Sequence, residues 1–138
     1  MKASISFHEL QQIIADKVKL GDMKIAECTF SKIDSQTVRA NLKIGLLPSH
    51  LDLKIEEISG TDLHLSYSGG FGIQSLVKTL LFYVKNNPDL AFVEKRGNSN
   101  LIVHLSQIEQ VKPVIDKIDV RTVSVISDAL EVDGTLKI

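Results

Sequence analysis

Hydrophobic residues are densest in the segment after Gly72, where they recur at the spacing of one helix face. Phe71, Phe82 and Tyr83 widen this stripe, so few positions remain for water. The pattern predicts a helix at about 72–86 that protein or a ligand must cover on most sides. The run is shorter than the roughly 20 apolar residues that a membrane-spanning helix needs. The helix face consists of Ile73, Leu76, Val77, Leu80, Leu81 and Val84.

Apolar and polar residues alternate in the segments before this helix, as in strands with one buried and one solvent-facing side. The alternation is clearest over residues 37–47. Because short turn sequences join the segments, we expect an antiparallel meander of four strands. The predicted strands are 23–33 (with Ala26, Cys28 and Phe30 on one face), 37–47, 51–56 and 63–68, with turns at 34–36, 48–49 and 59–62.

Two capping boxes mark helix starts, since a serine and a glutamate three residues later can satisfy each other's backbone amides. The first, Ser6–Glu9, predicts a helix at about 7–19. The second, Ser106–Glu109, predicts a shorter helix in which Pro113 causes a kink or an early stop. The remaining predicted strands are 90–95 and 101–105, which form a hairpin, and 119–127 and 129–137, which meet at Ser127–Asp128.

These elements predict an α+β fold in a single domain spanning residues 1–138. We expect a long antiparallel sheet of about seven to eight strands, curved around the central apolar helix, with two shorter helices. Each capping box opens a helix, strand, turn and strand, so residues 5–44 and 105–138 are candidates for a pseudo-repeat. A chain of 138 residues buries roughly two-thirds of its unfolded surface, which is enough for a real core.

Composition narrows the function classes. The net charge of −1 provides no global field that favours nucleic acid or an anionic membrane, and aromatic residues make up only 5% of the chain. We therefore expect no nucleic-acid partner and at most peripheral membrane contact. The only cysteine, Cys28, cannot form an intramolecular disulfide and is expected to be a small buried hydrophobe. The first residues lack a hydrophobic signal segment, which favours a cytoplasmic location, with prior removal of a leader left open.

No motif predicts catalysis, a cofactor or a metal. The glycines of Gly69–Gly72 match neither phosphate-binding spacing, so we expect a strand-to-helix corner or a hinge for the helix. The histidines lack metal-ligand spacing, and we expect His64 and His104 on the polar faces of strands. The acidic residues Glu56, Glu57 and Asp62 are expected on a solvated rim. The basic residues Lys85, Lys95 and Arg96 could meet a lipid head group, but solubilising charge is the simpler interpretation.

Several segments together resemble the tubular lipid-binding (TULIP-like) superfamily, and most closely its LmeA-type bacterial phospholipid-binding group. They are the capped helix Ile5–Ile14, the long alternating strands, the glycine corner with its apolar helix, Leu101–Ser106 and the closing strand Leu130–Gly134. The resemblance implies a curved antiparallel sheet that holds acyl chains against a helix. It carries over no catalytic residue. Family members are often longer, so a chain of this length would be one half-tube or would dimerise.

We therefore expect a non-enzymatic protein that binds a lipid or another elongated apolar ligand in a groove between sheet and helix. The residues expected to line this groove are Phe71, Leu76, Leu80, Leu81, Tyr83, Leu42, Ile44 and Leu65. The alternative is a homodimeric interaction or scaffold module in which a second copy covers the apolar helix. An enzyme with a site on the polar strand face is a third hypothesis, which would need His64, His104 and acidic residues to converge.

Overall fold

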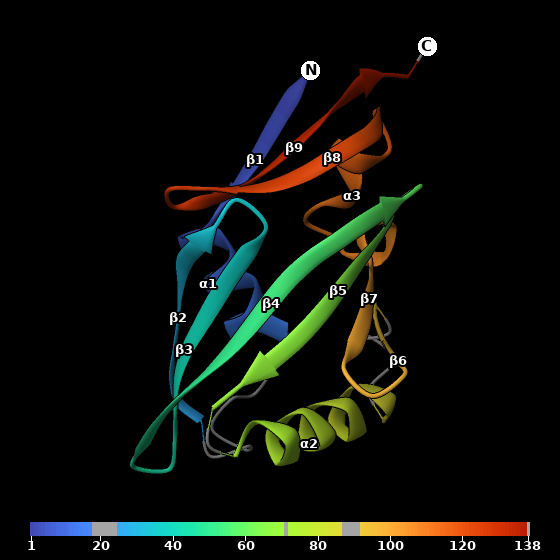
Figure 1. Ribbon diagram of the computed structural model, residues 1–138. Coiled ribbons are helices and arrows are strands. Elements are labelled where there is room, and N and C mark those ends of the chain that lie inside the picture. Colours follow the sequence, from blue (N-terminus) through green and yellow to red (C-terminus); the bar gives the residue numbers. More distant parts are fainter. Residues whose placement is uncertain (18–24, 71, 87–91, 138) are drawn as a thin grey trace.

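The α+β character of the chain is confirmed. The computed structural model describes residues 1–17, 25–70, 72–86 and 92–137 and contains nine strands and three α-helices within them (Figure 1). The N-terminal half comprises β1 (Lys2–Ser6), α1 (Phe7–Lys17), β2 (Ile25–Asp34), β3 (Thr37–Ile44), β4 (Leu47–Ser59) and β5 (Asp62–Gly69). The C-terminal half comprises α2 (Ile73–Lys85), β6 (Val93–Arg96), β7 (Asn100–His104), a 3-10 turn at Leu105–Gln107, α3 (Lys112–Ile115), β8 (Ile118–Ile126) and β9 (Ala129–Leu136).

The described strands form two antiparallel sheets, not the single sheet of seven to eight strands that the pattern predicted. Six strands pair in the order β2-β3-β4-β5-β7-β6, which confirms the meander from β2 to β5. The other three pair in the order β1-β9-β8. No strand of the three pairs with a strand of the six, and β1, which the pattern did not predict, pairs with β9 from Lys2 opposite Asp133 to Ser6 opposite Ala129.

Strand bulges keep apolar side chains on one face where the simple alternation breaks. In β4, Ile55 lies opposite Leu65 and Glu57 lies opposite His64, so Glu56 is an extra residue. In β8, an extra residue at Arg121 has the same effect. One inserted residue shifts the phase of a strand by one position. The apolar positions on either side of each bulge, 55 and 58 in β4 and 120 and 123 in β8, therefore face the same way.

One core cluster combines residues from both sheets and from the first two helices. The sheets are also joined by a backbone hydrogen bond, because the Val125 amide of β8 donates to the Ser35 carbonyl at the β2–β3 turn (2.8 Å). Three of the four most deeply buried side chains, Ile115, Ile118 and Val125, come from α3 and β8. We call this part of the molecule, near β1, β8 and β9, the three-stranded-sheet end.

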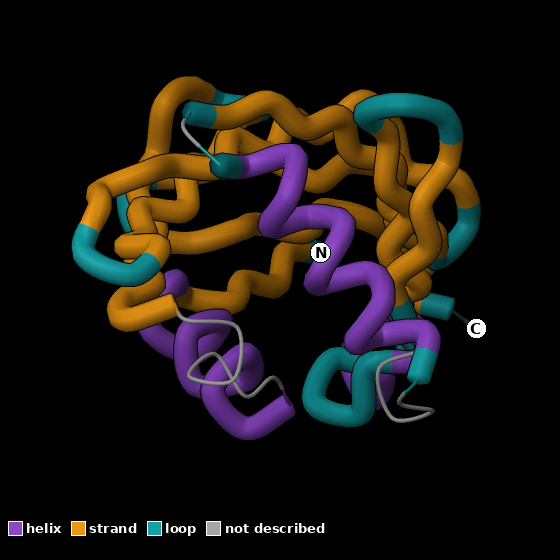
Figure 2. The backbone as a smooth tube through the Cα atoms, turned by 90° about the horizontal axis from the view of Figure 1, so that it is seen from below, coloured by secondary structure: helices purple, strands orange, loops and turns teal. Residues whose placement is uncertain are grey.

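The opposite end of the molecule is formed by α2 together with the β3–β4 and β6–β7 turns, and we call it the α2 end (Figure 1). Figure 2 shows α2 crossing this end diagonally, so the helix is not at the centre of a closed sheet. It contacts β4, β5 and β6, which lie on one side of it. The described residues of the chain do not themselves cover the C-terminal half of α2 on most sides, since Phe82 is 71% exposed, so the predicted coverage would have to come from a ligand or a partner.

The first capping box is confirmed, and it links β1 directly to α1. The Glu9 amide donates to Ser6 Oγ (3.0 Å), and the Ser6 amide donates to Glu9 Oε1 (3.1 Å). Each bond satisfies an amide that the first helical turn would otherwise leave without a partner.

Two other local predictions are wrong, and each involves a proline. The turn after β3 consists of Gly45 and Leu46, while Pro48 already belongs to β4 opposite Lys43. The first residues of β4 have a strand neighbour on one side only, where a proline is tolerated. Pro113 lies in the first turn of α3, where its missing N–H has no helical partner, so no continuous helix runs from the second capping box.

Candidate functional site

The predicted lining residues come from three elements, β3, β5 and α2. Leu42, Leu65 and Leu76 are buried within the core cluster; Ile44, Leu80 and Leu81 are half-buried and pack against it; Tyr83 is half-buried; and Phe71 lies outside the described residues. The structure therefore places six of the eight in, or packed against, one core cluster that spans both sheets and α2. Three of them are already covered by the protein itself.

Gly69 and Gly72, at the corner between β5 and α2, let the start of α2 pack closely against the sheet. A Cβ on Gly69 would lie 2.5 Å from Ile73 Cγ1 and 2.7 Å from the carbonyl oxygen of His50, so a side chain has no room there. Gly72 has a φ of 75°, in the left-handed region that glycine adopts without strain. A Cβ on Gly72 would lie 3.3 Å from Ile44 Cδ1, which shows how closely the β3–β4 hairpin approaches the helix.

Coverage decreases along α2 from its first turn to its last. Ile73 and Val77 are buried, Leu80 and Leu81 are half-buried, and Phe82 is exposed. The helix ends at Asn86, as predicted, where the backbone amide and the side-chain amide both donate to the Phe82 carbonyl (3.2 and 2.9 Å). The second half of α2 is therefore a well-formed helix with an incompletely covered apolar side.

An open hollow of about 290 Å³ lies elsewhere, between α1 and β2. It is lined by His8, Gln11, Gln12, Ile14, Ala15 and Cys28, none of which was predicted to line a site. Cys28 is half-buried, and burial raises the pKa of its thiol, which favours the neutral form. The sequence signal for this hollow was weak, because short polar side chains on one side of a helix are typical of any solvated helix.

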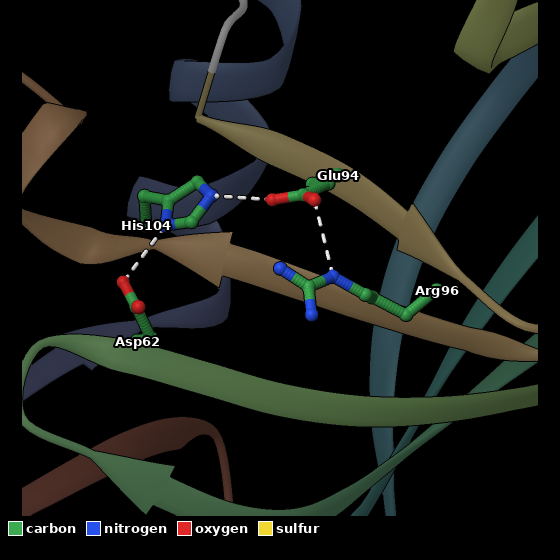
Figure 3. Close-up of polar contacts among 4 residues, drawn as sticks. All are labelled: Asp62, Glu94, Arg96 and His104. Atoms are coloured by element: carbon green, nitrogen blue, oxygen red, sulfur yellow. Dashed lines mark hydrogen bonds and ion pairs between the residues drawn. The ribbon is translucent and has the colours of Figure 1, made fainter.

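A histidine on the outer face of the six-stranded sheet contacts two carboxylates (Figure 3). His104 Nδ1 lies 2.8 Å from Asp62 Oδ1, and His104 Nε2 lies 3.2 Å from Glu94 Oε2. Glu94 also accepts from Arg96 Nε (3.1 Å). The hydrogen bond with Asp62, followed by the bond with Glu94, raises the pKa of His104. The side chains come from β5, β6 and β7, so this cluster ties three neighbouring strands together.

The histidine cluster is arranged as a charge pair and not as a nucleophile-activating site. Each ring nitrogen of His104 already faces a carboxylate, so neither can take a proton from a hydroxyl or thiol. The sequence placed His104 on a polar strand face but could not pair it with Asp62, because that pairing depends on the register of β5 and β7. Glu56 lies apart from Asp62 and accepts from Ser66 Oγ (2.7 Å), as expected for a solvated rim.

The described residues contain neither a candidate metal site nor a candidate membrane-spanning helix. Among residues 1–17, 25–70, 72–86 and 92–137, no group of three or more His, Cys, Asp or Glu side chains could hold a metal ion. No helix in the same ranges is both long and apolar enough to cross a membrane. No protein-family model, curated protein or solved structure matches the chain.

Proposed function

We propose that this protein binds a lipid or another elongated apolar ligand, without catalysis, between α2 and the inner face of the six-stranded sheet. The observation that carries the proposal is the row of half-buried apolar side chains where α2 meets the sheet, among them Ile44, Leu80 and Leu81. They already contact the core but retain apolar surface that a ligand would cover. The resemblance to lipid-binding proteins that curve a sheet around a helix points in the same direction.

The ligand would bind where the second half of α2 faces β4, β5 and β6. Leu42 and Leu65 on the sheet would form the floor, and Ile44, Leu76, Leu80, Leu81 and Tyr83 the walls. Because Leu42, Leu65 and Leu76 are already buried, entry would require the C-terminal half of the helix to move away from the sheet, with the glycine corner as the hinge. Each acyl methylene that leaves water contributes about 0.8 kcal/mol, so eight of them contribute roughly 6 kcal/mol.

The test is to purify the protein from cells, extract it for mass spectrometry and titrate it with a fluorescent fatty acid. We expect a co-purified apolar molecule or saturable uptake of the probe. The double variant Leu80→Asn/Leu81→Asn should weaken uptake about tenfold, because it makes the wall polar. Val114→Asn, which changes a partly exposed apolar residue on α3, is the matched control and should bind normally. Empty protein that takes up no probe would contradict the proposal.

The alternative function, a homodimeric interaction module, is favoured by the exposure of Phe82 on the outer side of α2. A second copy could cover this side chain and leave no room for a small ligand. Size-exclusion chromatography with light scattering distinguishes the two functions. A stable dimer that excludes the fatty-acid probe would support the module, and a monomer that binds the probe would support the carrier.

A further inference from the structure

Large apolar side chains project into solvent at the α2 end. Leu46 is 94% exposed and Leu47 is 53% exposed, and both lie at the β3–β4 turn. Phe82, at 71%, lies on the outer side of α2. The turn lies beside the start of the helix, because Ile44 approaches Gly72 closely. Figure 1 shows the β3–β4 turn and α2 at the same end of the molecule, so these three exposed apolar residues belong to one end.

The fold itself does not require leucine at this turn. The β4–β5 hairpin has the same construction, with Gly60 and Thr61 as its two turn residues, and Gly60 has a φ of 63° against 65° for Gly45. The residue after the glycine is threonine in one hairpin and leucine in the other. Since the turn geometry accepts a polar residue, the exposed Leu46 must be explained by something other than folding.

The charged side chains of α2 are both positive. On α2, Phe82 lies four residues after Lys78 and three residues before Lys85, and both lysines are exposed. The sequence from Leu63 to Pro88 contains no acidic residue. Lys95 of β6 adds an exposed cation beside the helix. Exposed phenylalanine, leucine and lysine are residue types that bind a membrane interface, the apolar ones through burial and the lysines through anionic lipids.

We propose that the α2 end docks on the surface of an anionic phospholipid bilayer. Leu46, Leu47 and Phe82 enter the boundary between head groups and acyl chains, while Lys78 and Lys85 contact lipid phosphates. A second copy of the chain fits this surface less well, because a symmetric contact through α2 would bring lysines of the two copies together. Docking goes beyond ligand binding, since it uses the outer side of α2 and needs no acyl chain between helix and sheet.

The experiment is co-sedimentation of the full chain with vesicles of phosphatidylcholine alone or of phosphatidylcholine with phosphatidylglycerol. We expect binding to the anionic vesicles, weakened by high salt, and little binding to the neutral ones. Leu46→Ser/Leu47→Ser and Phe82→Ser should each lower the partition coefficient about tenfold. Lys78→Gln/Lys85→Gln should lower it by a similar factor and reduce its salt dependence. Circular dichroism melting confirms that each variant is folded.

The matched control is Ile33→Ser, since Ile33 is also an exposed apolar residue but lies near the β2–β3 turn at the other end. It should leave the partition coefficient unchanged. Equal binding of all variants, or no preference for anionic vesicles, overturns the proposal. A dimer that Phe82→Ser dissociates, without vesicle binding, also overturns it and identifies a second copy as the occupant. Fatty-acid uptake is measured in a separate experiment, so a failure to bind vesicles would not contradict the proposed ligand binding.

Discussion

The three-stranded-sheet end and the α2 end contain similar apolar residues but cover them to different degrees. At the first, Ile115 and Ile118 are 1% exposed. At the second, Ile73 and Val77 in the first half of α2 are buried too, but Ile44, Leu80 and Leu81 are half-buried and Phe82 projects outward. Burial of apolar area is the main favourable term in folding, so the first end should carry more of the stability. The second end retains apolar surface for a ligand or a membrane.

The largest expected difference between the ends comes from truncating one isoleucine at each. Ile118→Ala removes a fully buried side chain and should lower the free energy of unfolding by about 3 to 4 kcal/mol. Ile44→Ala makes the same chemical change at a half-buried position and should cost about 1 kcal/mol. Urea unfolding of both variants measures the two values. Equal losses would contradict the division of the molecule into a packed end and an open end.

A glycine at the packed end offers a second test. A Cβ on Gly134 would collide with the carbonyl oxygen of Asp119 on the neighbouring strand β8, near the bulge at Arg121. Because the obstacle is backbone, Gly134→Ala should cost about 2 to 3 kcal/mol. Thr135→Ala, at the next and exposed position of β9, is the control and should change stability by less than about 0.5 kcal/mol. The melting temperatures of the two variants measure the difference. If they are equal, the close approach of β8 and β9 is not a constraint in solution.

The sequence predicted the hairpins well because their signals are local. Alternation in β3 and β5 and the turn at Ser127–Asp128 each depend on a few neighbouring residues. The separation into two sheets could not be predicted in this way. It depends on which strands pair across the chain, as when β1, a strand of five residues, pairs with β9 more than 120 positions away. Local periodicity contains no information about such a pairing.

The candidate site, like the fold, could be predicted from the sequence only in part. The apolar positions of β3, β5 and α2 were recognisable because core residues follow the helix and strand periods. How completely the chain covers these positions could not be predicted from the sequence, since the coverage depends on which strands pack beside α2. Leu42 and Leu46 illustrate this: both are leucines near the same hairpin, one buried and one almost fully exposed.

The smallest effect concerns the histidine cluster, which ties β6, one of the strands that α2 contacts, to β5 and β7. A pKa raised by hydrogen bonds means that folding favours protonated His104. Its stabilisation is therefore complete below the ordinary histidine pKa and is lost as the pH rises through the raised value. The wild type should exceed His104→Gln in stability by about 1 kcal/mol or less near pH 6, because the carboxylates are half-exposed, and the difference should be smaller at about pH 8.5.

Urea unfolding at both pH values measures this difference, and a double-mutant cycle with Asp62→Asn isolates the pair. A coupling that is zero at both pH values would show that the contact does not stabilise the sheet. Where coupling is found, its loss at high pH should loosen β6 and β7 but leave β8 and β9 unchanged, because the cluster touches only the six-stranded sheet. Hydrogen exchange that rises at β6 and β7 alone would then place the pH dependence at the edge that supports α2, the helix that we propose moves to admit a ligand.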